Sequence, residues 1–307
     1  VIGNGSVKSA KKRKVNQTID VFVGKNKELQ DAYNELTVSF NDSCDLVVRA
    51  YDEGVAYHFA TRLNGEITII SEDAIFNFAS TPTIYYPECD ANYSGETDQS
   101  GRTHQVHQGY RNFERLYKVY KGPLEIPYER FAVSPVLYEY PDSPYKVVVT
   151  ESNTYDYPAL YMESNGYNSM RGKWANYPKE TIDSDPSNPY YWYSNHLVVT
   201  RENYIAKTDG NRSFPWRVII VSEDDKSLLN NELVYKLADP CRLTDTSWIQ
   251  PGKSAWEWWH KAVLEGVDFP SGNKQLSLQL YKYYVAWASK NQIEYMTMDA
   301  GWSKDYM

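Results

Sequence analysis

The stretch DLVVRAYDEGVAYHFAT, residues 45–61, contains two runs of β-branched and aromatic residues, each of strand length. Asp52, Glu53 and Gly54 separate the two runs. These residue types favour tight turns and bulges, so we expect the chain to turn there without leaving the domain. The stretch therefore predicts two strands of one β domain.

The same pattern extends outward from this stretch. From about residue 15 to 240 the chain reads as short strands broken by polar turns, an all-β pattern. Further runs of strand length are ELTVSF (35–40), GEITIIS (65–71), YKVVVTE (145–151), NHLVVTRENYIAK (195–207) and WRVIIVSE (216–223). Between them, residues 87–112 and 163–195 are rich in Asn, Ser, Gly, Pro and Tyr, which predicts long loops of the kind that often carry function.

The pattern changes after Pro240. GKSAWEWW (252–259) is a compact apolar strand candidate, and IEYMTM (293–298) is a second one. Between them, residues 276–291 place Leu276, Leu280, Tyr284 and Ala288 at four-residue spacing, the apolar stripe of an amphipathic helix. A strand, a helix and a strand in this order predict a βαβ unit with parallel strands, opening a larger α/β domain. We therefore expect a domain boundary near residues 240–250.

Composition limits the classes of partner. The formal net charge of the 307 residues is −8, which argues against nucleic acid as the main partner. The basic run KSAKKRKV (8–15) is expected to be a solvated surface segment, with a nucleic-acid patch as the alternative. Three cysteines are too few and too scattered for a disulfide framework or a metal cluster. No apolar run approaches the roughly 18 residues of a membrane helix, so no membrane span is predicted.

Several blocks of the sequence resemble glycoside hydrolase family 97. They are DAYNELTVSF (31–40), VVRAYDEGVAYHF (47–59), VVVTESNTYDYPALYM (147–162), PWRVIIVSEDDKSLLNNELVYKLADPCRLTDTSWIQPGKSAWEWW (215–259), GVDF (266–269) and YKYYVAWASKNQIEYMTMDAGW (281–302). The resemblance covers most of residues 15–307. It implies a mainly β super-sandwich, galactose-mutarotase-like, over residues 1–245. Residues 246–307 would then hold the first strands of a (β/α)8 catalytic barrel.

The resemblance also implies an activity and its cofactor. Family members are α-glucosidases and α-galactosidases that act on oligosaccharides, and a periplasmic or secreted location is expected. Both catalytic carboxylates come from later barrel strands, so they are expected beyond residue 307, in the remaining barrel and carboxy-terminal domain of the same protein. Members bind Ca²⁺ with one glutamate from the amino-terminal domain, and Glu151 matches that position. From the pattern alone, Glu151 would instead be an exposed acid that ends a strand.

Candidate substrate-binding residues follow from the predicted strand ends. Asp299 follows the second strand, at the edge where such barrels place their active sites, so it is a candidate sugar ligand, with a turn role as the alternative. Glu257, within the first predicted strand, would share a face with Trp259 by alternation, as a sugar ligand or as the partner of a buried basic group.

Aromatic residues near these strand ends have two possible roles. Trp258, Trp259 and Trp302 would stack on a sugar or fill the barrel interior, and filling is favoured for two of the three; Trp259 is the candidate for binding. His260 is expected to be a surface residue rather than a general base.

The motifs resemble one branch of the family more than the other. PGKSAWEWW and the pattern of Asp299, Gly301 and Trp302 look like the retaining, α-galactosidase-like branch, although Ala300 stands where members often carry an acid. The leading hypothesis is a calcium-dependent, retaining α-glycosidase that releases galactose or glucose. The alternative is a non-catalytic carbohydrate-binding protein.

Overall fold

The computed structural model divides into two compact units, Val1–Cys241 and Arg242–Met307. It describes residues 5–89, 96–97, 103–104, 119–124, 131–166, 168–183 and 196–299. The strands before residue 90 are β1 (Val7–Asp20), β2 (Glu28–Phe40), β3 (Cys44–Tyr51), β4 (Gly54–Ile69), β5 (Ile75–Asn77) and β6 (Thr83–Cys89).

The rest of the first unit holds shorter strands and two short helices. The strands are β7 (Glu96–Thr97), β8 (Thr103–His104), β9 (Val119–Pro123), β10 (Phe131–Val133), β11 (Val136–Glu139), β12 (Lys146–Ser152), β13 (Tyr161–Ser164), β14 (Ser169–Lys173), β15 (Pro178–Asp183), β16 (His196–Arg201), β17 (Ala206–Ser213) and β18 (Trp216–Ser222). The helices are α1 (Asp225–Leu229) and α2 (Leu233–Leu237).

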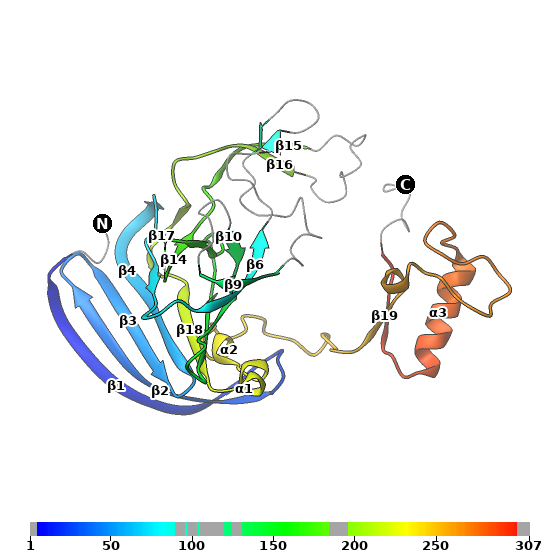
Figure 1. Ribbon diagram of the computed structural model, residues 1–307, viewed down its shortest axis with the longest axis horizontal. Coiled ribbons are helices and arrows are strands. Elements are labelled where there is room, and N and C mark those ends of the chain that lie inside the picture. The colour runs from blue at the N-terminus through cyan, green and yellow to red at the C-terminus, as the bar shows by residue number, and fades with distance from the viewer. Residues whose placement is uncertain are drawn as a thin grey trace. The chain divides into compact units, whose positions relative to one another are not determined.

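One large antiparallel sheet dominates the first unit. Its 14 strands follow the order β1-β2-β3-β4-β18-β12-β11-β6-β10-β13-β14-β5, with β17 paired to β4 and β9 paired to β6. Strands β1 to β4 form a strongly curved layer (Figure 1). The prediction of a mainly β super-sandwich is confirmed.

The hairpin expected at residues 45–61 is present. Strands β3 and β4 pair from Cys44 opposite Thr61 to Tyr51 opposite Gly54, so the turn falls at residues 52–53. A Cβ atom added to Gly54 would lie 2.3 Å from the carbonyl oxygen of Ile219 on β18. The close approach of β4 and β18 therefore requires glycine at this position.

Two sequence expectations need correction. The basic run at residues 8–15 lies within β1, at the end of the sheet, where most of its side chains are exposed as expected. The strand itself was missed because polar side chains on an edge strand hide the apolar alternation. The predicted loop at residues 163–195 contains β14 and β15, so the loop prediction is wrong there. Residues 90–95, 98–102, 105–112, 167 and 184–195 of the two predicted loops lie outside the described residues.

Buried tyrosines form part of the core of the first unit. Tyr86 and Tyr138 are fully buried in the larger cluster with Ile84, Val149 and Met162. The Tyr86 hydroxyl donates to the carbonyl oxygen of Met162 at 2.7 Å, so its polar end is satisfied inside the core. A second cluster packs helix α2 onto β18 and β4.

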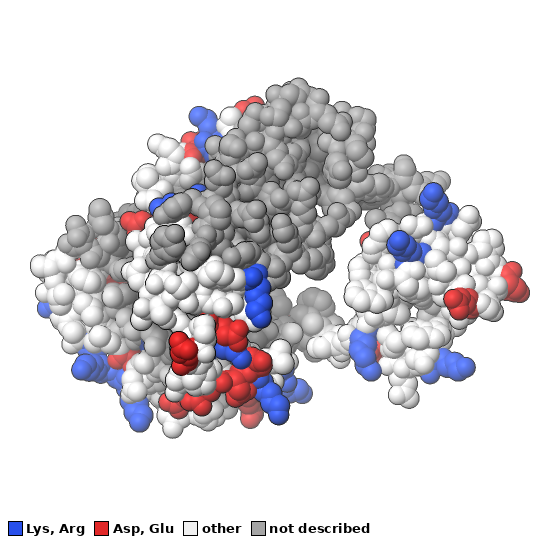
Figure 2. Space-filling model, viewed as in Figure 1, with Lys and Arg blue, Asp and Glu red and all other residues white. Residues whose placement is uncertain are grey.

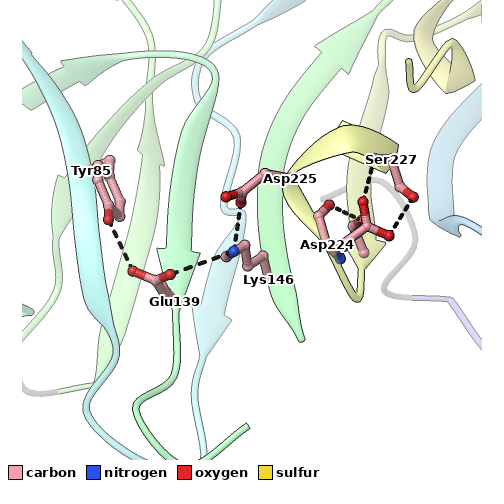
Figure 3. A network of polar contacts seen from close by, with 7 residues as sticks. Tyr85, Glu139, Lys146, Asp224, Asp225 and Ser227 are labelled. Carbon is pink, nitrogen blue, oxygen red and sulfur yellow. Dashed lines mark hydrogen bonds and ion pairs between the residues drawn. The ribbon is translucent and has the colours of Figure 1, made fainter. Parts of the chain in front are cut away.

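A network of polar contacts fixes helix α1 against the sheet surface (Figure 3). Lys146 on β12 lies 2.5 Å from Asp225 of α1 and 3.7 Å from Glu139 on β11. The Tyr85 hydroxyl on β6 donates to Glu139 at 2.9 Å. Figure 2 likewise shows acidic side chains gathered beside basic ones on part of the face it displays. Because these pairs are largely solvated, each contributes little to the free energy of unfolding.

The second unit is the predicted βαβ arrangement. It holds β19 (Ser254–Trp256), the 3-10 helix η3 (Glu257–His260), α3 (Leu278–Lys290) and β20 (Tyr295–Thr297). Strands β19 and β20 are parallel, and the predicted stripe is confirmed because Leu280, Tyr284 and Ala288 are the buried residues of α3. The first strand is shorter than predicted, since the chain turns into η3 at Glu257. None of the described helices is both long and apolar enough to span a bilayer.

The buried His58 gives a testable pH dependence of stability. Its side chain is 7% exposed and its ring centroid lies 4.0 Å from that of Trp216. Burial lowers the pKa of His58 from 6.5 to about 4, with Arg49 adding to the effect. Between these two pH values the unfolded chain binds the proton and the folded chain does not. Stability from this group is therefore present above the unfolded pKa and lost as the pH falls towards 4.

We expect this site to cost about 2–3 kcal/mol of the free energy of unfolding between pH 7 and pH 4.5. His58→Phe keeps the aromatic contact and should lose less stability over this range in urea unfolding. His260→Phe, at an exposed histidine, is the matched control and should behave as the unmodified chain does. Equal acid sensitivity of both variants would contradict the assignment.

Candidate functional site

Glu151 lies near the end of β12, directly opposite Arg217 on β18. One carboxylate oxygen accepts a hydrogen bond from Arg217 Nη1 at 2.7 Å, and the other accepts the backbone N–H of Leu160 at 2.7 Å. Arg217 is 1% exposed and binds Glu72 through two further hydrogen bonds of 2.7 Å. The Tyr157 hydroxyl donates to Glu72 at 2.8 Å. One buried guanidinium thus holds two carboxylates.

In this cluster, burial and ion pairing act in opposite directions on the pKa values of the charged groups. Desolvation opposes the charge of Arg217, but hydrogen bonding and attraction from Glu72, with the charge of Glu151, hold its pKa above the ordinary value. Burial raises the pKa of Glu151, while the N–H of Leu160 and the charge of Arg217 act against that rise. The cluster therefore depends on its internal pairing, because no group in it is well solvated.

The described residues around Glu151 do not fit a calcium ion. Calcium takes six to eight oxygen ligands, while both Glu151 oxygens are engaged and one of them faces a guanidinium. Within the described part of the chain, no three His, Cys, Asp or Glu side chains gather as a metal site would need. Glu151 is not the exposed acid of the alternative interpretation either, since it is a largely buried ion-pair partner.

In the second unit, Glu257 and Asp299 lie together at the strand ends. Glu257 is 2% exposed, and its Oε1 accepts hydrogen bonds from the Tyr281 hydroxyl at 3.0 Å and from the backbone N–H of Asp299 at 2.9 Å. Trp256 Nε1 donates to Asp299 Oδ2 at 3.0 Å. The end of β19 therefore holds both the backbone and the carboxylate of Asp299 beyond the end of β20. We call these four residues the strand-end site.

Trp259 lies outside the strand-end site but beside one of its members, with its ring centroid 6.4 Å from that of Trp256. Trp259 is 83% exposed and Trp258 is 49% exposed, so neither fills the interior of this unit. Strand alternation would have placed Trp259 on the face of Glu257, but η3 turns the chain after Trp256. Trp302 lies outside the described residues. His260 is exposed, as expected, and its Nε2 lies 2.8 Å from the Tyr284 hydroxyl.

Trp256 and Tyr281 are the members of the strand-end site that the sequence reasoning missed. Trp256 is the last residue of β19, one position before Glu257, so its place at the strand end was a usable signal. Tyr281 lies beside the buried stripe of α3, where an outward position would have been the default. Burial, with Glu257 nearby, raises the pKa of Tyr281 to about 12, so its hydroxyl stays protonated and donates at neutral pH.

One polar atom of the strand-end site is unsatisfied. Glu257 Oε2 is buried and has no hydrogen-bond partner among the described residues. A buried carboxylate oxygen without a donor is costly, so the site calls for a donor from elsewhere. Asp299 is only partly buried, and carboxylates of this kind accept hydrogen bonds from hydroxyl groups of a bound ligand.

Comparisons with known proteins agree with this architecture. A family model described as glycosyl-hydrolase 97 N-terminal matches residues 1–240. A retaining alpha-galactosidase from Bacteroides thetaiotaomicron is 33% identical over 301 residues, covering 98% of this chain and 43% of that protein.

Solved structures share the fold at lower identity. A glycoside hydrolase family 97 enzyme from Pseudoalteromonas sp. strain K8, in complex with acarbose, gives a TM-score of 0.68 at 18% identity, covering 98% of this chain and 40% of that one. A beta-arabinopyranosidase gives 0.67 at 15% identity, covering 97% and 43%. The chain thus spans less than half the length of these relatives.

We expect Arg217→Met to lower the free energy of unfolding by about 3–5 kcal/mol, because it leaves two carboxylates without their buried counter-charge. Arg62→Met is the matched control, since Arg62 pairs with Asp45 at the surface and should cost less than about 1 kcal/mol. Urea unfolding of both variants measures the difference. Equal losses would show that the Arg217 cluster is not a stabilising centre.

We expect Glu257→Ala to speed hydrogen exchange at the Asp299 amide by about fivefold, the size of one lost hydrogen bond. Glu257→Gln keeps a carbonyl acceptor and should preserve most of the protection. The amide of Tyr295, which donates to the backbone oxygen of Lys253, is the internal control measured in the same NMR spectra. Unchanged exchange at Asp299 in Glu257→Ala would contradict the contact.

Proposed function

Because the chain belongs to the glycosyl-hydrolase 97 family, we propose that the whole protein is a retaining α-galactosidase acting on oligosaccharides. The observation that carries the proposal is the 33% identity to a retaining alpha-galactosidase along nearly the entire chain. Because the chain spans only 43% of that relative, the activity is proposed for the protein that contains this chain. The identity favours galactose over glucose, and a periplasmic or secreted location belongs to the same proposal.

Asp299 is assigned to substrate binding rather than to catalysis. Its carboxylate is held by Trp256 and its backbone by Glu257, so it offers a fixed acceptor for a sugar hydroxyl at the end of β20. In barrels built from βαβ units, this edge of the sheet carries the active site. Glu257, which is 2% exposed, orients Asp299, and the exposed Trp259 offers a face for a further sugar ring.

We propose that the two reacting carboxylates lie outside the described residues. A retaining glycosidase needs an acid and a nucleophile about 5–5.5 Å apart, on either side of the bond that breaks. Glu257 already accepts two hydrogen bonds in a buried position, and the Asp299 carboxylate accepts one from Trp256. Neither arrangement resembles a free nucleophile.

Calcium dependence stays a prediction of the family resemblance. Hard oxygen ligands would hold the ion and it would polarise substrate oxygens, but Glu151 is committed to Arg217 and Leu160. No step of the proposed reaction is therefore assigned to the ion.

We expect the whole protein to hydrolyse a nitrophenyl α-galactoside and to release α-galactose first, as NMR of the fresh product shows. Asp299→Asn should lower kcat/KM by roughly 10- to 100-fold, the size of a lost charged hydrogen bond. Glu265→Gln, at an exposed acid of the same unit, is the control and should keep full activity. The calcium prediction is tested by the same assay with a chelator, which should abolish activity if the enzyme depends on calcium.

Absence of turnover of the nitrophenyl α-galactoside would overturn the proposal. Galactose binding without turnover would favour the non-catalytic carbohydrate-binding alternative instead. Release of β-galactose first would show inversion and reject the retaining mechanism.

A further inference from the structure

The first unit contains a cavity of about 480 Å³. It lies where β4 changes partner, from β18 at residues 54–57 to β17 at residues 60–69. At this junction the N–H of Phe214 donates to the carbonyl oxygen of Phe59 at 2.8 Å. None of the lining residues belongs to the strand-end site. The volume falls within the range of about 300–1,000 Å³ of small-molecule pockets.

Aromatic rings form much of the cavity wall. Tyr57, Phe59, Tyr157 and Phe214 all line it. Tyr157 and Phe214 pack edge to face, with ring centroids 5.7 Å apart, so this wall has a defined shape. Flat apolar faces of this kind suit the C–H faces of a pyranose ring.

Polar groups on the same wall provide hydrogen-bond partners. Glu72 lines the cavity together with Arg217, and the Glu72 side chain is 20% exposed. A carboxylate has about four acceptor positions, of which Arg217 and Tyr157 use three on Glu72. The Tyr57 hydroxyl has no partner among the described residues, and burial together with Glu72 raises the pKa of Tyr57, so the hydroxyl can donate.

Hydrogen-bonding groups rather than an unpaired buried charge line this cavity. Arg217 and Glu72 are paired with each other, and Asp73 is exposed to solvent. A molecule with several hydroxyl groups and no charge can use the remaining donor and acceptor positions without displacing these pairs. We propose that this cavity is a binding site for a single neutral sugar ring, such as one residue of an oligosaccharide. The proposal goes beyond the hydrolase function, since it requires no turnover.

The test is a titration of this chain, labelled at isoleucine methyl groups, followed by NMR. Ile69 and Ile70 line the cavity, whereas Ile293 lies in the second unit. D-galactose or D-glucose should produce saturable shifts at Ile69 and Ile70 and none at Ile293. Spermidine, as a cationic probe, should leave all three unchanged.

Tyr57→Phe should weaken sugar binding by about three- to tenfold, since it removes one hydroxyl and keeps the ring. Tyr235→Phe, at an exposed tyrosine of α2, is the matched control and should bind as the unmodified chain does. Asp299→Asn should also leave the shifts at Ile69 and Ile70 unchanged.

Three results would overturn the proposal. They are the absence of shifts at Ile69 and Ile70 with both sugars, equal sugar affinity of Tyr57→Phe and Tyr235→Phe, and shifts at Ile69 and Ile70 with spermidine but not with sugar. Failure of hydrolysis in the whole protein, with these shifts present, would reject the proposed function alone.

Discussion

The buried guanidinium of Arg217 joins parts of the β unit that are far apart in the sequence. It reaches Glu151 on the neighbouring strand β12 and Glu72, 145 positions earlier, just beyond the end of β4. Burying an arginine is costly unless its donors are filled, and two carboxylates fill them here. The position of the segment after β4, and with it one wall of the 480 Å³ cavity, therefore depends on this ion pair.

The same interaction explains why the expected calcium ligand takes another role in this structure. Both oxygens of this carboxylate already accept hydrogen bonds, from Arg217 and from the Leu160 N–H, so a calcium ion would compete with a positively charged guanidinium for them. Sequence pattern places Glu151 at a strand end but says nothing of the residue opposite. That residue is set by the antiparallel register of β12 and β18.

Features that depend on local sequence periodicity could be predicted, whereas features that depend on contacts between distant segments could not. The strands around Asp52 and the buried stripe of α3 follow from local periodicity, and both are present. The edge strand β1 could not be recognised from its own polar residues. It is a strand because it pairs with β2 along its length. The strand-end site was half predicted. Asp299 and Glu257 follow from strand ends, whereas Tyr281 depends on how α3 packs.

The geometry of Glu257 shows how the strand-end site is built. The β19–β20 ladder ends at Thr297, and the Asp299 amide beyond it donates to the side-chain carboxylate of Glu257. A glutamine at position 257 could accept the same two hydrogen bonds, from Tyr281 and from Asp299, without the cost of a buried charge. Since a carboxylate stands there with its Oε2 unsatisfied among the described residues, its charge points to a further donor from the rest of the protein or from substrate.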